Sequence, residues 1–138
     1  MTSRAGTSRS LGVGWPELVA VAVGGMLGTA LRLGIDSAMP HGDAEFAAST
    51  LLVNVLGSFA LGLLVGRAWL DAPGWLRAGL GPGLLGAFTT FSAVAVSLVA
   101  MSTEGEWMLA ASYLVATLVL GLGAATLGLR VGRRGSTR

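Results

Sequence analysis

The chain has no cysteine, and charged residues are scarce. Without cysteine, its 138 residues hold neither a disulfide framework nor a thiolate metal site. Charged residues make up 12% of the sequence, about half of their usual share in soluble domains. So few charges cannot cover the surface of a water-soluble globule, and 53% of the residues are hydrophobic. Much of the surface must therefore face a lipid bilayer.

The sequence also lacks the patterns that mark enzymes and nucleic-acid-binding proteins. No nucleophile stands with a base and an orienting partner, and no cluster of metal ligands is present. The glycines between 79 and 86 lack the lysine of a phosphate-binding loop. Eight of the nine basic residues lie at the chain ends or in one short loop, so no basic face exists for nucleic acid. We expect a protein that is not an enzyme.

Four apolar segments are long enough to cross a membrane, which takes about 20 residues of helix. They predict a single four-helix transmembrane domain over residues 1–138. The glycines around Pro82 weaken a helix at the start of the third segment and predict a late or irregular beginning there. The expected spans are approximately 17–33, 46–65, 76–101 and 107–129, with polar tails over 1–14 and 130–138.

Arginine is distributed unequally between the two sides of this layout. Only Arg32 falls on one side, alongside the acidic residues Asp36, Asp43, Glu45, Glu104 and Glu106. By the positive-inside rule, both termini are expected in the cytoplasm, and the chain is expected in the cell inner or plasma membrane as a multi-pass protein. The arginines on the other side are Arg4, Arg9, Arg67, Arg77, Arg130, Arg133, Arg134 and Arg138.

In the second span, polar and small residues form one stripe. Thr50, Asn54 and Ser58 recur at every fourth position, and Gly62 and Gly66 continue the spacing. One interpretation is close helix packing, which small and hydrogen-bonding residues favour in membranes. The other is an ion pathway in which the Asn54 amide donates hydrogen bonds to a permeating anion, with the two hydroxyls as further donors.

The third span contains the string G-A-F-T-T-F-S at 86–92, where two threonines and a serine compete for backbone hydrogen bonds. We expect a break in the helix there, tolerated only beside protein or a water-filled cavity. The freed carbonyls suit a hard cation, whereas the positive ring edge of Phe91 suits an anion.

Two further polar residues have a functional and a plain interpretation. Arg32, at the end of the first span, either anchors the helix at the interface or attracts anions to a vestibule. Thr117, in the fourth span near Ser112 and Tyr113, is on its own typical of a packing residue.

Three strings together resemble the CrcB/Fluc family of fluoride channels. They are G-G-M-L-G-T-A-L-R at 24–32, T-L-L-V-N-V-L-G-S-F at 50–59, and the string at 86–92. The resemblance covers roughly residues 17–129. It implies an all-α membrane protein that assembles as an antiparallel, inverted dimer and exports cytoplasmic fluoride passively, so that fluoride toxicity falls.

The resemblance also implies roles for individual residues. Main-chain oxygens of Gly86 and Thr89 from both subunits would enclose a structural sodium ion at the dimer centre. The residues implied for the fluoride pathway are Asn54, Phe91, Thr50, Ser92 and Thr117.

One position departs from the family pattern. Val94 stands where members commonly carry a second phenylalanine, and a valine offers no aromatic edge. Together with the arginine asymmetry, this favours a subunit committed to one orientation, paired in a heterodimer with a related chain of opposite orientation. The alternatives are a homodimer, an accessory half that hardly conducts, and a proton-coupled small multidrug exporter. An exporter would need a carboxylate within the membrane, and Glu17 lies only at its edge.

Overall fold

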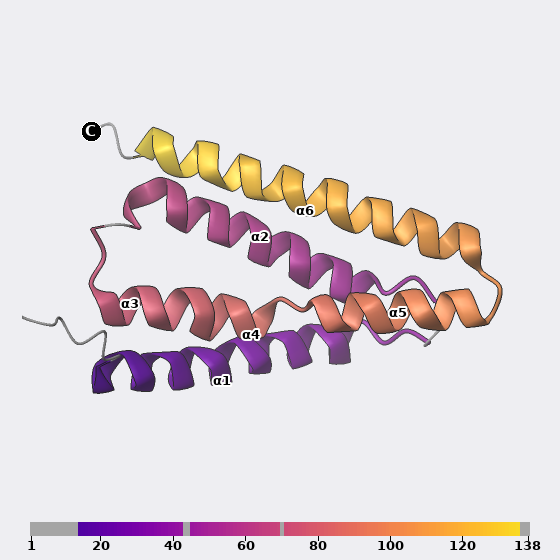
Figure 1. Cartoon of the computed structure of the whole chain (residues 1–138), viewed down its shortest axis with the longest axis horizontal. Coiled ribbons are helices and arrows are strands. Elements are labelled where there is room, and N and C mark those ends of the chain that lie inside the picture. The colour runs from indigo at the N-terminus through magenta and orange to yellow at the C-terminus, as the bar shows by residue number, and fades with distance from the viewer. Residues whose placement is uncertain (1–13, 43–44, 70, 136–138) are drawn as a thin grey trace, which may run out of the picture.

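The computed structural model describes residues 14–42, 45–69 and 71–135, and the ordered elements in these ranges are all helical. The helices lie along a common long axis (Figure 1). A first helix, a second helix and a last long helix are continuous, whereas the third apolar segment is divided into four pieces. The elements are α1 (Trp15–Ala38), α2 (Ala48–Ala68), α3 (Gly74–Ala78), the π-helix η1 (Gly79–Leu85), α4 (Gly86–Phe88), α5 (Phe91–Thr103) and α6 (Trp107–Gly135).

Four helical segments, Trp15–Ala38, Ala48–Arg67, Gly74–Thr103 and Trp107–Arg134, are long and apolar enough to cross a membrane. Each overlaps the span expected from hydropathy and extends past it at one end or both. The third segment does not begin late, because it is helical from Gly74; its irregularity is π-helical winding around Pro82. Residues 130–135 continue α6. The tails over 1–13 and 136–138 lie outside the described residues.

Glycines bring the helices together in two pairs, α1 with the η1–α4 segment and α2 with α6 (Figure 1). A side chain on Gly28 would overlap the main-chain oxygen of Leu84. In the other pair, a Cβ on Gly62 would overlap the Ala125 oxygen, and one on Gly128 would overlap the Phe59 oxygen. In a bilayer, helices gain little by hiding apolar surface from each other, so such backbone contacts carry the packing.

Between α4 and α5 the chain is extended for two residues. Thr89 has φ −78° and ψ 154°, and Thr90 has φ −149° and ψ 122°. Helix α5 then begins at Phe91, where the Thr90 hydroxyl accepts a hydrogen bond from the Ala93 amide at 3.2 Å. Threonine is a favoured residue at this capping position, so the sequence ends one helix and starts the next within two residues.

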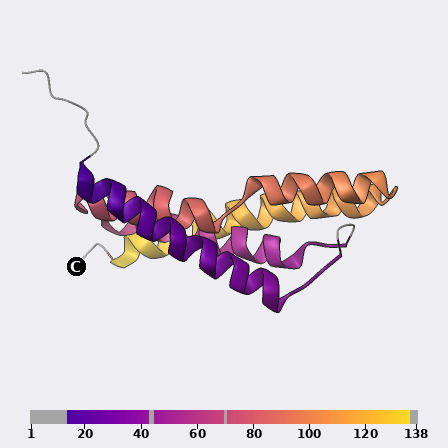
Figure 2. The same ribbon diagram turned by 90° about the horizontal axis from the view of Figure 1, so that it is seen from below.

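Beyond the interruption, α5 lies along the first half of α6 (Figure 2). A small buried cluster forms where they meet the start of α2, and the Tyr113 ring packs edge-on against Phe46 with centroids 5.1 Å apart. On the same side, the Ser49 hydroxyl donates to the Asp36 carboxylate at 2.7 Å and joins α2 to α1. The cluster consists of Ala47, Val94, Met101, Ala110 and Tyr113.

The packing argument predicts opposite effects for two alanine substitutions on α6. Gly128→Ala should destabilise the protein by about 1–3 kcal/mol, because the methyl group meets the α2 backbone. Gly123→Ala has nothing within 4 Å of the new carbon and should leave stability unchanged or raise it by up to about 1 kcal/mol. Thermal unfolding in detergent micelles measures both, and equal effects of the two substitutions would contradict the packing.

Candidate functional site

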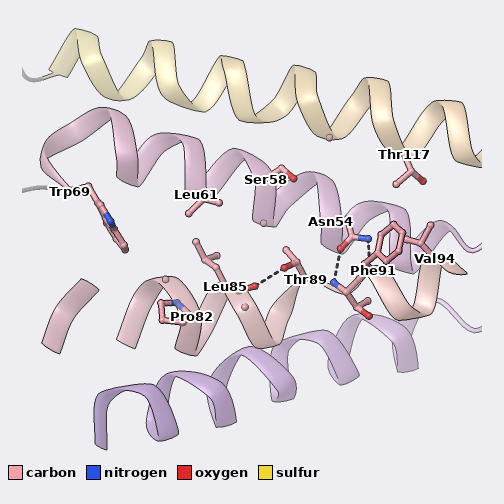
Figure 3. Close-up of a pocket in the computed structure, with 15 residues that line it drawn as sticks. Asn54, Ser58, Leu61, Trp69, Pro82, Leu85, Thr89, Phe91, Val94 and Thr117 are labelled. Atoms are coloured by element: carbon pink, nitrogen blue, oxygen red, sulfur yellow. Dashed lines mark hydrogen bonds between the residues drawn. The ribbon is translucent and has the colours of Figure 1, made fainter. Parts of the chain in front are cut away.

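A cavity of about 560 Å³ lies between the two helix pairs, beside the interruption of the third segment (Figure 3). Helix α2 lines one wall, the segment from Gly81 to Val94 lines another, and α6 contributes two residues near its middle. Most of the lining is apolar. The polar side chains on it are Asn54, Ser58, Thr89, Thr90 and Thr117.

The Asn54 side chain holds the extended chain at Thr90 by two hydrogen bonds (Figure 3). Its Oδ1 accepts from the Thr90 amide at 2.8 Å, and its Nδ2 donates to the Thr90 carbonyl at 2.9 Å. An asparagine amide has two N–H groups, so one donor remains after this contact. Asn54 therefore fixes the interruption and still presents a donor where it lines the cavity.

This contact frees main-chain oxygens that a continuous helix would use. In an α-helix, the Gly86 carbonyl would accept from the Thr90 amide, which here donates to Asn54. The Thr89 carbonyl would accept from the Ala93 amide, which here donates to the Thr90 hydroxyl. Gly86 and Thr89 both line the cavity. Two oxygens without their regular donors at the carbonyl end of a helix are the kind of ligands that a hard cation prefers.

The other side of the interruption has the opposite polarity. Helix α5 has 13 residues, and its N-terminus lies at the cavity next to Asn54. A helix N-terminus carries partial positive charge from its amides, which favours an anion. The carbonyl end of α4 and the amide end of α5 thus lie within a few residues of each other in the chain.

Two buried hydroxyls near this cavity have no partner at good hydrogen-bonding geometry among the described residues. They are Tyr113 Oη and Thr117 Oγ1, which lie one helical turn apart on α6. Thr117 lines the cavity, and the hydroxyls of Ser97, Thr50 and Thr117 surround that of Tyr113. An unpaired hydroxyl in an apolar interior costs about 1–3 kcal/mol. A ligand that accepts a hydrogen bond from either hydroxyl would recover this cost.

The structure brings together most, though not all, of the residues expected from the sequence. Asn54, Phe91 and Thr117 line the cavity, as do Gly86 and Thr89. The Phe91 ring is 81% exposed, so its own chain leaves it uncovered.

Three other expected residues lie off the cavity. Thr50 is buried and faces the Tyr113 hydroxyl. Ser92 is exposed, and its hydroxyl lies 3.0 Å from that of Thr90. Arg32 is half-buried on α1 and does not line the cavity. The parts that these residues play in conduction stay predictions.

Sequence reasoning missed two features of the site. The Thr90 main chain is the partner of Asn54, and Tyr113, interpreted as a packing residue, carries one of the unpaired hydroxyls. A threonine that precedes a new apolar run is a signal for a helix cap and could have marked Thr90. The contact with Asn54 spans 36 positions, and no local pattern indicates it.

The fold and the cavity define a multi-pass membrane protein whose cavity carries several polar side chains, and the chain belongs to the CrcB family. The family model described as CrcB-like protein, Camphor Resistance (CrcB) matches residues 19–129. A fluoride-specific ion channel FluC of Saccharophagus degradans is 40% identical over 115 residues, which cover 80% of this chain and 85% of the relative. Fluoride-specific ion channel FluC 1 of Geobacillus kaustophilus is 40% identical over 113 residues, which cover 82% and 95%.

The Asn54 contact makes a prediction about local stability. Asn54→Ala leaves the Thr90 amide and carbonyl without partners, and the cost of about 1–3 kcal/mol should speed exchange of the Thr90 amide hydrogen about 5- to 100-fold. Amide exchange measured by NMR in micelles tests this. Ser58→Ala, one turn further along the same cavity wall, is the matched control, and a Thr90 amide that exchanges equally in both variants would contradict the contact.

Proposed function

We propose that this chain is a subunit of a fluoride-specific ion channel that exports cytoplasmic fluoride passively and lowers fluoride toxicity. The observation that carries the proposal is the set of neutral donors at the cavity, namely the free N–H of Asn54 and the unpaired Thr117 hydroxyl. Such donors can replace water around a small anion, and because they are several and uncharged, the anion can leave again. Its role is therefore transport, not catalysis.

The surroundings of these donors support an anion over a cation in the pathway. No aspartate, glutamate or histidine lines the cavity, so nothing there repels an anion or binds a proton in exchange. The N-terminus of α5 adds positive potential, and the edge of the Phe91 ring adds an electropositive surface. A proton-coupled exporter would need a carboxylate in this place, and Glu17 stands only in the first turn of α1.

The carbonyl side of the interruption supports a structural sodium ion. Gly86 and Thr89 would hold it through their main-chain oxygens, whose regular helical donors are engaged elsewhere. Sodium would supply positive charge that neutralises these oxygens in a medium without water. The chain's own part is performed by Asn54 and the Thr90 hydroxyl, which keep those donors away.

We further propose that the channel is a dimer of inverted subunits, in which a partner covers the exposed Phe91 ring. Five arginines of the described residues lie toward one end of the helices, and Arg32 alone lies toward the other. Such a bias suits one orientation in the membrane, with both termini in the cytoplasm. Val94 is 1% exposed within the buried cluster and offers no aromatic edge to the pathway. Both facts support a related partner chain of opposite orientation.

Fluoride efflux from liposomes that contain the purified chain tests the function. Thr117→Val keeps the shape of the side chain and removes the unpaired hydroxyl, so efflux should fall about tenfold or more, since a hydrogen bond to a charged group contributes about 1.5–3 kcal/mol. Asn54→Asp and Phe91→Ala should also lose efflux. Ser112→Ala is the control, because that hydroxyl bonds to its own helix at Leu109. Undiminished efflux in Thr117→Val would contradict a fluoride pathway past the Thr117 hydroxyl. No efflux in the parent would indicate an accessory subunit.

The orientation of the chain is tested separately, and the lack of native cysteine makes the test clean. Single cysteines at Glu106→Cys and Asp71→Cys report the two sides of the membrane. In intact cells, an impermeant thiol reagent should label the first and spare the second. Equal labelling of both would contradict a fixed orientation. We expect the chain expressed alone to conduct weakly, and full fluoride conduction without a partner would refute the heterodimer.

A further inference from the structure

At the end of the cavity away from Asn54, one large aromatic side chain lines the wall. Trp69 directly follows the last turn of α2, and its indole lies across the gap toward Pro82 (Figure 3). The same side chain also lines a smaller cavity of about 170 Å³. The Trp69 indole is therefore a wall that the two cavities share.

The position of the indole depends on a glycine in the π-helix. A Cβ added to Gly81 would lie 3.1 Å from Trp69 Cζ2 and 3.2 Å from Cη2, closer than ordinary van der Waals contact. The absence of that carbon lets the ring lie against the η1 backbone. The ring therefore has a cavity on each side and the η1 backbone along its edge. The wall between the two cavities is a single side chain.

The smaller cavity has one charged residue in its lining. Arg67, in the last turn of α2, is exposed and lines it together with Leu64, Leu76 and Leu80. A guanidinium beside apolar walls raises the local concentration of small anions, because the low-dielectric walls strengthen its field. This cavity lies at the end of the helices that carries most of the arginines.

We propose that Arg67 and its cavity form an anion antechamber, and that the Trp69 indole separates it from the main cavity and limits the passage of small anions between them. The proposal rests on the proposed function for the identity of the anion. It adds a residue that controls access and a charge that gathers ions on the arginine-rich side. Neither residue belongs to the donor set around Asn54.

A plain structural role for Trp69 predicts different behaviour. Tryptophan is common at membrane interfaces as an anchor, and Trp75 in α3 is such a residue, half exposed and absent from the lining of both cavities. If Trp69 only anchors the helix end, its removal should act like the removal of Trp75. If it is a partition, its removal should open a path.

Access to the main cavity tests the partition without any need for conduction. A cysteine at Ser58→Cys lies on the cavity wall between Trp69 and Asn54. With an anionic methanethiosulfonate reagent on both sides of the vesicles, adding Trp69→Ala should raise the labelling rate several-fold, and adding Trp75→Ala should not. An unchanged labelling rate with Trp69→Ala, or an equal rise with Trp75→Ala, would overturn the proposal.

Fluoride efflux provides the second measurement. Trp69→Ala should speed efflux several-fold, Trp69→Phe should give a smaller increase, and Trp75→Ala should match the parent. Arg67→Gln should slow efflux about 2- to 10-fold at low ionic strength and less in concentrated salt, since the field of one charge is screened within about 8–10 Å at physiological salt. Arg130→Gln is its control, an exposed arginine on α6 that lines neither cavity.

These outcomes separate the two proposals. A parent that conducts fluoride at the same rate as Trp69→Ala supports the channel and overturns the partition. A parent that does not conduct, but in which Trp69→Ala speeds labelling of Ser58→Cys, indicates an accessory subunit in place of a conducting one and keeps the partition for small anions. Slower efflux in Trp69→Ala would also overturn the partition.

Discussion

The structure depends most on the pair of hydrogen bonds between the Asn54 side chain and the Thr90 main chain. A bilayer interior offers no water to backbone groups, so a helix can be interrupted there only if other groups satisfy the freed amide and carbonyl. The asparagine amide matches the backbone in kind, with one acceptor and a donor placed side by side. It therefore pairs with one residue of the interruption as a neighbouring strand would, and it adds a polar link to the packing of α2 on the third apolar segment.

This contact has a chemical consequence on each side. Because the Thr90 amide turns to Asn54 and the Ala93 amide turns to the Thr90 hydroxyl, the carbonyls of Gly86 and Thr89 are left with negative potential. The N-terminus of α5 contributes positive potential immediately afterwards. One interruption thus creates a site suited to a cation and a site suited to an anion, without any ionised side chain. Full charges in the same place would be expensive in a membrane and would hold an ion too tightly for it to leave.

Hydropathy predicted most of the helical architecture, because the bilayer imposes length and apolarity on each span. The spacing along α2 also singled out Asn54, which lines the cavity, and Gly62 and Gly66, which meet α6. The rest depends on tertiary contacts that periodicity does not encode. The stripe had two interpretations, close helix packing and an ion pathway, and its residues meet different surroundings: Tyr113 at Thr50, the cavity at Asn54 and Ser58, and α6 at its glycines. Likewise, Gly81 and Pro82 predicted irregularity, but only the packing of α1 and Trp69 on that segment shows why the backbone must lack side chains there.

Two aromatic side chains that line the main cavity differ in how far the chain itself covers them. At one end the Phe91 ring is 81% exposed, so only something outside the chain can complete that wall. At the other end the Trp69 indole completes the wall from within, resting on the backbone at Gly81. The proposed pathway between subunits would have to be assembled before it conducts, whereas the proposed partition within the subunit would act in each copy independently. The neutral donors at Asn54 and Thr117 line the same cavity and would replace the water around an ion in that pathway. A small anion that forms strong hydrogen bonds is stabilised most by such groups, because each donor can approach it closely. Neutral donors also avoid the desolvation cost of burying a charged side chain.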